Sequence, residues 1–451
     1  MCRMLWLALL VDSYCWAQND MIANINLQFQ LSNPGARALA MGGAFVGLAD
    51  DATAVFSNPA GMARLKSDLI TLELGRTERD NEIPFYGGTI RQTGLQDFEY
   101  NLDARDFPEN GQSVPFAAYL SANHRLKWGV VYAERAQFER SFQTQDIYLP
   151  HEPDDDRPVN DFTDFYFFPS NNHIDLNLRM LGMSGGISLN DNWSVGVTLA
   201  YSDFTYEGRT GLVLPDIFPA GHPLTAFVGQ EWATIEVEGD DGTISGSAGF
   251  MYRPNESFSI GAAYRYQPDF DYDYQVHVLD FASETLELDD SGRQVFATPD
   301  SYGLGVAIKP NDTVVVSLEV NRVQYSELSD TYHQFFDSGG ETQTVDDATE
   351  YRVGLEWFVT RFAKPLALRC GYWFEPYHAL KNTYLDNQIL YADDQGFQHI
   401  RNAVFLQQFE EDTDHLSLGF GLTLTQHFAL DAAADTSSVS TLFSLSGIYR
   451  F

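Results

Sequence analysis

A serine flanked by glycines is the pattern in this chain that comes closest to a catalytic motif. Gly182-Met-Ser-Gly-Gly186 matches G-x-S-x-G, in which a nucleophilic serine stands at a sharp turn between a strand and a helix. Here the motif lies within a predicted strand that ends at the turn Asn190-Asp-Asn192, so we interpret the match as chance. The ten histidines and three cysteines show no metal-ligand spacing. We therefore predict no catalytic residue, no metal site and no cofactor.

Arginines that alternate with apolar residues are stronger candidates, because a guanidinium group can bind the carboxylate of a ligand through two hydrogen bonds. A strand over residues 350–359 would place Arg352 and Glu356 on its polar face. Arg369 has the same parity in the next segment, and a tight turn at 360–365 would set it opposite Glu356, which would neutralise it. The predicted anchors for an anionic ligand are therefore Arg352, Arg37 and Arg64. Structural ion pairing of these arginines is the alternative interpretation.

Two apolar segments between the predicted strands are candidates for capturing a hydrophobic ligand. They are Asp164-Phe-Tyr-Phe-Phe-Pro169 and the segment 212–219, both unusually apolar for loops. A hydrophobic ligand needs an apolar surface with few polar groups. We predict that Phe165, Phe167 and Phe168 belong to an initial capture surface. The alternative is that the two loops fold onto each other and cap the structure.

A period-two pattern after residue 66 provides the elements that would position these residues. In the segment 415–424, leucines and a phenylalanine share one face, and small residues the other. In the segment 351–359 the apolar face is Tyr351, Val353, Leu355, Trp357 and Val359. The same alternation predicts fourteen strands, near residues 68–76, 114–120, 126–134, 180–188, 193–201, 244–252, 258–266, 301–309, 313–323, 350–359, 366–374, 415–424, 428–434 and 439–451.

The connections between these strands alternate in length. Six are short, and all but the last of the other seven are long, up to about forty residues. An even number of strands, with short turns on one side and long loops on the other, is typical of bacterial outer-membrane barrels. We therefore predict an all-β fold, a 14-stranded antiparallel transmembrane β-barrel in residues 67–451. A soluble β-sandwich is the alternative, but it does not need this asymmetry.

The composition excludes several functions. Acidic residues outnumber basic ones by 63 to 27, and the formal charge of −36 argues against binding nucleic acid or an anionic membrane surface. Beyond the N-terminus no segment approaches the ~20 apolar residues of a transmembrane helix. Membrane insertion would then require a closed sheet, which satisfies its own backbone hydrogen bonds. Cys370 is the one cysteine beyond residue 17, so we expect no intramolecular disulfide.

The N-terminus is predicted to carry a secretory signal peptide, residues 1–17. Arg3 supplies a positive start, Leu5–Val11 a short apolar core, and Ala17 a small residue at the cleavage site. A disordered start is the alternative. Localisation in the bacterial outer membrane follows from the signal and the predicted barrel together.

Residues 18–66, which we call the hatch, are rich in Ala and Gly after Ser32. Ala36–Val46 favours a helix that ends at Gly47, while Asn58 can cap a second helix that Pro59 begins. Two or three short helices with small side chains would fit the lumen of a fourteen-stranded barrel, which side chains alone do not fill. A periplasmic helical tail that never enters the lumen is the alternative.

These features together carry a resemblance to a known family. The element Asn58-Pro59-Ala60 in a Gly/Ala-rich hatch, the fourteen predicted strands and the terminal aromatic residue resemble the FadL family of outer-membrane transporters for long-chain fatty acids and aromatic hydrocarbons. The segment 247–266 is similar to the family's midchain hairpin, and Asn58-Pro59-Ala60 matches the hatch motif. The chain departs from the family pattern after residues 127–130, where Glu134 and Arg135 stand in place of a Pro-Phe-Gly turn.

The resemblance implies passive uptake of hydrophobic compounds, above all long-chain fatty acids. Extracellular loops would capture the ligand, an apolar pocket in the lumen would receive it, and the hatch would rearrange as it leaves through a gap beside a kinked strand. The implied partners are hydrophobic small molecules, outer-membrane lipid and lipopolysaccharide, and the barrel-assembly machinery, with a monomeric protein and no nucleic acid. The hatch is also similar to a shuttle barrel of the type IX secretion system, so a role in protein export stays open, as does a lipid-hydrolysing barrel.

Overall fold

The computed structural model describes residues 34–92, 98–149, 165–216, 223–280, 285–328, 343–362, 364–379, 381–382, 404 and 411–451. The predicted signal peptide and the first part of the predicted hatch lie outside these residues. In the part of the chain that the structure describes, no helix is long and apolar enough to cross a membrane.

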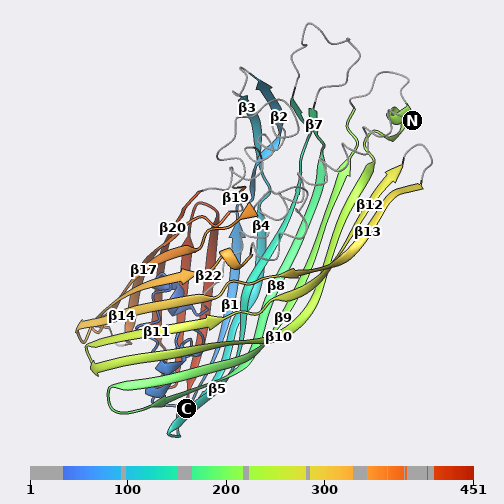
Figure 1. The fold of residues 1–451 in the computed structure, drawn as a ribbon. Helices are drawn as coiled ribbons and strands as arrows, with labels where there is room; N and C mark the ends of the chain where they lie inside the picture. The colour runs from blue at the N-terminus through green and yellow to red at the C-terminus, as the bar shows by residue number, and fades with distance from the viewer. Residues whose placement is uncertain are drawn as a thin grey trace.

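Fourteen antiparallel strands of the described chain close into a barrel, as predicted (Figure 1). In sequence order they are β1 (Leu69–Arg79), β4 (Glu109–Ser121), β5 (Leu126–Gln143), β8 (Ser170–Ser188), β9 (Trp193–Val213), β10 (Glu231–Asn255), β11 (Phe258–Tyr266), β14 (Ser301–Asn311), β15 (Val314–Val323), β17 (Ala348–Val359), β18 (Leu366–Glu375), β20 (Thr413–Thr423), β21 (Phe428–Thr436) and β22 (Ser440–Arg450). The first and last strands pair with each other, and β10 pairs with both β9 and β11. Each predicted segment overlaps one of these strands.

The barrel has a turn end and a loop end. Short turns join β4 to β5, β8 to β9, β10 to β11, β14 to β15, β17 to β18 and β20 to β21 at the turn end, near the C-terminus in Figure 1. At the loop end, β5, β8, β9 and β10 run well beyond the predicted segments; β9 and β10 remain paired from Tyr252↔Trp193 up to Glu231↔Val213. The sequence pattern did not predict these extensions, because the residues on their outer face are no longer apolar and the alternation on which the prediction depends is lost.

Smaller elements lie at the loop end. The hairpin β12 (Phe270–Asp280) and β13 (Thr285–Phe296) pairs with the upper half of β10, at Ala233–Glu238. A four-stranded sheet has the order β3 (Phe98–Asp106), β2 (Glu82–Gln92), β6 (Ile147–Leu149) and β7 (Phe165–Phe167). The remaining elements are the strand pair β16 (Gln343–Thr344) and β19 (Lys381–Asn382), and the 3-10 helix η2 (Pro223–Phe227).

The outer face of the barrel carries the predicted apolar residues. Leu199, Leu304, Tyr351 and Leu418, which represent four different strands, are 62%, 57%, 54% and 67% exposed. Aromatic residues stand at both margins of this belt: Tyr201, Tyr264, Tyr302, Tyr351 and Tyr372 toward the loop end, and Trp193, Tyr252, Trp357 and Tyr449 toward the turn end. An apolar band between two aromatic girdles is the lipid-facing surface of a transmembrane barrel. Val359, predicted to face outward, is instead buried, because the strand ends there in the turn.

The described hatch residues lie inside the barrel, where Figure 1 shows them as short helices within the wall. They form α2 (Ala36–Ala40), α3 (Ala54–Ser57) and the 3-10 helix η1 (Pro59–Arg64). Inward-facing groups from opposite sides of the wall bind them: Glu73 of β1 accepts from Gly35 N, and Ser259 of β11 donates to Gly47 O. Residues 34–65 therefore fill the lumen near the turn end.

The first predicted hatch helix is shorter than expected. It ends at Ala40, because Gly42 and Gly43 adopt positive φ angles of 62° and 70°, so Gly47 is not a helix end. The second prediction is confirmed: the side chain of Asn58 accepts a hydrogen bond from Ala60 N, and Pro59 is the first residue of η1.

Candidate functional site

Apolar side chains fill the described interior between the hatch and the loop end. We call this group the aromatic cluster; it comprises Ile83, Phe85, Ile90, Ala136, Phe138, Phe142, Ile147, Phe167, Ile174, Leu176, Leu178, Phe204, Tyr206, Phe270, Tyr272, Phe296 and Val404. Phe204 of β9 stacks on Phe270 of β12 and Phe296 of β13, with ring centroids 4.8 and 5.1 Å apart. The strand extensions and the hairpins of the loop end thus enclose an apolar core above the hatch.

The predicted capture residues are part of this packing. Phe167 is 5% exposed and belongs to the aromatic cluster. Phe168 packs against the same cluster and meets the ring of Trp232 edge-on, with centroids 5.4 Å apart. Phe165 lies on β7, and its side chain is outside the described part. Phe167 is therefore buried in the structure, and its role in ligand capture stays a prediction.

A small pocket with three arginines lies where the aromatic cluster meets the hatch. It is lined by Arg135, Arg265, Ser301, Asn321, Val323, Glu350 and Arg352. The three arginines are 2%, 6% and 8% exposed, respectively. Three guanidinium groups and one carboxylate line the pocket, and the buried carboxylates of Glu319 and Glu375 interact with Arg352 from outside this lining.

A β-bulge places Arg135 in this pocket. The register between β5 and β8 shifts between Glu134 and Ala136, so that Arg135 and its neighbour Ala136 both point inward. Among the described residues, no carboxylate forms an ion pair with Arg135, and its buried Nε has no hydrogen-bond partner. The ring of Phe56 lies 4.2 Å from this guanidinium, but a buried cation without a carboxylate partner is costly, so this position favours an anionic ligand.

Arg352 lies in the pocket as the parity of its strand predicted. Its Nη2 is 2.8 Å from Glu350 Oε2, and its guanidinium stands 4.5 Å from the ring centroid of Trp373. Arg265, which the prediction left out, donates to Ser57 O of the hatch at 3.0 Å. The parity of β11, where Ser259 and Ala263 also face inward, was a signal that could have identified Arg265.

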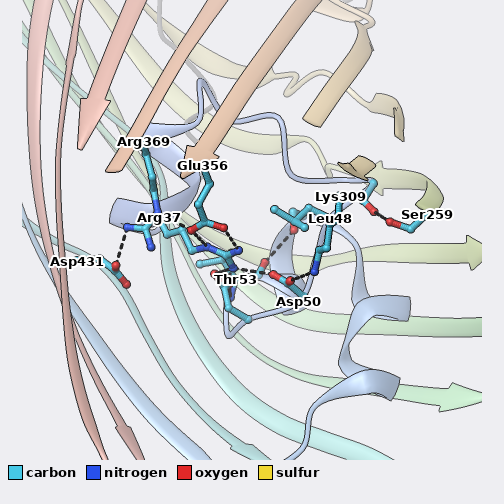
Figure 2. Close-up of polar contacts among 12 residues, drawn as sticks. Arg37, Leu48, Asp50, Thr53, Ser259, Lys309, Glu356, Arg369 and Asp431 are labelled. Carbon is cyan, nitrogen blue, oxygen red and sulfur yellow. Dashed lines mark hydrogen bonds and ion pairs between the residues drawn. The ribbon is translucent and has the colours of Figure 1, made fainter. Parts of the chain in front are cut away.

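Arg37 lies elsewhere, in an ion-pair network that joins the hatch to the wall (Figure 2). Its Nη2 is 2.8 Å from Glu356 Oε2, and its Nη1 bonds Asp50 at 2.6 Å and Asp51 at 3.0 Å. The predicted neutralisation of Arg369 is present: Arg369 Nε is 2.7 Å from Glu356 Oε1, directly across the ladder. The donors of Arg37 are thus engaged within the protein, as the alternative interpretation described.

Arg64 is at the turn end. Its guanidinium donates to the backbone oxygen of Asp191, in the turn between β8 and β9. It does not line the pocket. Of the three predicted anchors, Arg352 is therefore the one that lines this pocket.

Asn58, the first residue of the hatch motif, joins the hatch to itself and to the wall. Its Nδ2 donates to Val46 O at 2.9 Å and to Phe250 O of β10 at 3.2 Å. Pro59 and Ala60 are buried beside β9 and β10. The motif thus stabilises the hatch and attaches it to the wall.

Inward-facing glycines make room for the hatch backbone. A Cβ atom on Gly371 of β18 would lie 2.1 Å from Gly42 N, and one on Gly196 of β9 would lie 2.3 Å from Pro59 C. Such distances are too short for any side chain. The small residues opposite the apolar face of the strands are therefore explained by the close approach of the hatch.

The wall is interrupted between β4 and β5. Their ladder runs from Ser121↔Trp128 to Phe116↔Ala133 and stops there. Beyond it, residues 109–113 of β4 pair with β1, and residues 136–143 of β5 pair with β8. Pro115, which has no backbone N–H, follows the end of the ladder on β4, and the bulge at Arg135 follows it on β5. The interruption thus adjoins the pocket.

The G-x-S-x-G match lies within β8, without the strand-to-helix turn of a nucleophile elbow. Ser184 Oγ is 2.7 Å from Thr198 Oγ1 on the neighbouring strand. This contact gives the serine a role in wall pairing.

Comparison with known proteins adds a family and a fold. The sequence model of the family described as "Outer membrane protein transport protein (OMPP1/FadL/TodX)" matches residues 162–389, half of the chain. A FadL homologue from Pseudomonas aeruginosa is similar in structure, with a TM-score of 0.61 at 16% identity, over 94% of this chain and 99% of that one. The toluene transporter TodX of P. putida gives 0.57 at 14%, with the same coverage. The toluene transporter TbuX of Ralstonia pickettii gives 0.54 at 14%, again over 94% and 99%. No curated protein matches the chain.

Proposed function

Because the chain belongs to the OMPP1/FadL/TodX family of outer membrane transport proteins, we propose that it takes up long-chain fatty acids and binds their carboxylate in the arginine pocket. The family establishes the coarser function, a channel for hydrophobic compounds in the bacterial outer membrane. In that membrane the turn end faces the periplasm and the loop end faces the outside.

The observation that carries the proposal is the charge of the pocket. Arg135 has no carboxylate partner among the described residues, and three of the seven lining residues are arginines. A neutral hydrocarbon would leave Arg135 without an anionic partner, whereas a carboxylate would accept charge-assisted hydrogen bonds from it. The adjoining aromatic cluster offers apolar surface for the acyl chain, beginning at Ala136 next to Arg135.

A route follows from the same geometry. The ligand enters at the loop end, moves along the aromatic cluster, and places its carboxylate in the pocket. It leaves through the wall between β4 and β5, where the ladder stops above Phe116↔Ala133. The register shift at Arg135 supports the choice of β5 as the kinked strand that the resemblance implied. Transport along this route is passive, as the resemblance implies, and the ligand moves down its own concentration gradient.

Binding of oleate to two pocket variants tests the proposal. Arg135→Met and Arg352→Met keep much of the side-chain volume but remove the charge. Each should weaken oleate binding to the purified protein by about 10- to 100-fold, the range for one charge-assisted hydrogen bond. Uptake of radiolabelled oleate by cells that lack other fatty-acid channels should fall in parallel.

The matched control is Arg322→Met. Arg322 is exposed, pairs with Asp347 at 3.0 Å, and does not line the pocket. It should bind oleate as the unmodified protein does. Unchanged affinity in both pocket variants would contradict the proposal, and uptake of toluene without uptake of oleate would favour a hydrocarbon channel.

A further inference from the structure

The interruption of the wall between β4 and β5 has a lower and an upper limit. The lower limit is the last pair of their ladder, Phe116↔Ala133. Above the upper limit, β6, which follows β5 in the chain, pairs in parallel with β2 at Gly88↔Ile147 and Thr89↔Tyr148. We call the stretch between these limits the window; it comprises residues 110–115 of β4 and 134–140 of β5.

A side chain closes the upper limit of the window. Glu109 of β4 accepts the backbone N–H of Ser141 on β5 through its Oε1. In an antiparallel ladder this N–H would bond to a backbone carbonyl of the neighbouring strand. In the described chain no ladder pair joins β4 to β5 at this height, so the carboxylate takes the place of the carbonyl.

Asn81, which follows β1, holds both sides of the window from a separate position. Its Oδ1 accepts from Arg140 Nε of β5 at 3.0 Å. Its backbone oxygen accepts from Phe107 N, two residues before Glu109, at 2.9 Å. Each strand also keeps its other neighbour, since β4 pairs with β1 and β5 pairs with β8. Loss of the Glu109 contact therefore widens the window at its top and leaves both strands attached.

Open space lies beside Gly111 of β4, within the window. Its ladder partner is Thr77 of β1, which has the same parity on that strand as the inward-facing Glu73. A Cβ atom on Gly111 would meet no atom of the described chain within 4 Å, apart from its own chain neighbours. Near the lower limit the space is filled, since a Cβ atom on Gly75 would lie 2.7 Å from Pro115 Cγ. A larger side chain at position 111 therefore fits without displacing the wall and occupies the lumen side of the window.

We propose that Glu109 and Gly111 set the largest cross-section of a compound that leaves the barrel, and thereby select slim acyl chains over bulky ring systems. The inference rests on the proposed function, in which the ligand leaves between β4 and β5. It adds that this selection takes place at the exit. The arginine pocket binds the headgroup, so two acids with the same carboxylate bind there alike and differ in their passage through the window.

Uptake of two carboxylates of different width tests the proposal. Cells that lack other fatty-acid channels are given radiolabelled oleate, a slim acid, or abietate, a tricyclic one, and uptake by cells without this protein is subtracted. Glu109→Ala should raise the ratio of abietate to oleate uptake about fivefold, as expected when the strands separate more easily by one hydrogen bond. Gly111→Leu should lower the ratio about tenfold, at the lower end of discrimination by fit.

Two matched variants serve as controls. Glu109→Gln keeps an acceptor oxygen for Ser141 N and should stay within about twofold of the parent ratio. Gly185→Leu lies outside the window at a wall glycine whose Cβ would meet only ordinary contacts, and it should keep the parent ratio. Oleate affinity, measured by calorimetry on the purified proteins, should be the same in every variant, because neither Glu109 nor Gly111 lines the pocket.

The outcomes separate this proposal from the proposed function. An unchanged ratio in Glu109→Ala, or equal loss of both acids in Gly111→Leu, would overturn selection at the window. If oleate binds the parent while the ratios stay unaltered, the window proposal alone is refuted. If the parent neither binds nor takes up oleate, both proposals are refuted.

Discussion

Replacement of Glu356 by glutamine should loosen the hatch. Glu356 is fully buried and accepts hydrogen bonds from Arg37 Nε and Nη2 at 2.9 and 2.8 Å and from Arg369 Nε at 2.7 Å. Breaking a buried ion pair by removing one partner costs about 3–5 kcal/mol. Glutamine keeps one acceptor oxygen, and both arginines retain other carboxylates, Asp50 and Asp51 for Arg37 and Asp431 for Arg369. The expected loss is therefore near the lower limit, about 3 kcal/mol.

Hydrogen exchange measured by mass spectrometry reports this loss. Backbone amides of residues 35–51 should exchange about 100-fold faster in Glu356→Gln, because local opening becomes about 3 kcal/mol easier. The matched control is Glu350→Gln on the same strand, also buried and paired with an arginine, whose ion pair is with Arg352 of the wall. Exchange in residues 35–51 should not change in the control. A change below about threefold in Glu356→Gln would refute the view that this ion pair holds the hatch.

Three further perturbations probe other parts of the structure. Gly371→Val places a side chain where the hatch backbone lies, so ion conductance through planar bilayers should rise; Gly185→Val, whose Cβ meets only ordinary contacts, is the control and should leave conductance unchanged. Asn58→Ala loses a cap and two further hydrogen bonds and should destabilise the hatch by about 2–3 kcal/mol, visible as faster amide exchange; unaltered exchange would contradict its role as a joint. A hydrogen bond from Arg209 lowers the pKa of Glu231 at the loop end, so its stabilising effect is present above the ordinary glutamate pKa and is lost as the pH falls through the lowered value. The difference in melting temperature between the parent and Glu231→Gln should therefore be constant at neutral pH and shrink below about pH 4; a difference that grows in acid would reverse the sign of this linkage.

The sequence was sufficient to predict the strands of the wall, because residues that face lipid must be apolar and their neighbours that face the hatch must be small or polar. Leu418 faces lipid, while its neighbour Ser417 is buried inside, so the alternation is strong wherever the belt runs. The Asn-Pro pair at residue 58 predicted the second hatch helix for a local reason, since the cap and the first helical residue are adjacent. Above the belt the outer face is no longer apolar, and β8 runs ten residues beyond its predicted start at 180.

The pocket was less predictable. Arg352 could be placed by parity alone, and its parity was right. Arg135 depends on a bulge between Glu134 and Ala136, and no glycine or proline marks that position in the sequence. The departure from the family pattern at Glu134 and Arg135 indicated that the backbone differs there. It did not indicate that the Arg135 side chain would point into the lumen. The contact of Arg265 with the hatch could not be predicted, because it is made with a carbonyl group about two hundred positions away in the sequence. Only tertiary packing brings the two residues together.

Because the inward-facing glycines of the wall touch the hatch backbone, substitutions in the wall and in the hatch should depend on each other during evolution. A Cβ atom on Gly371 or Gly196 would overlap the backbone of Gly42 or Pro59. Neither the wall nor the hatch can therefore change its shape here without a change in the other. Among descendants of this gene, a larger residue at either wall position should be accompanied by a rerouted or shortened hatch. Sequences that keep the small wall residues should keep the length between Gly42 and Pro59 as well.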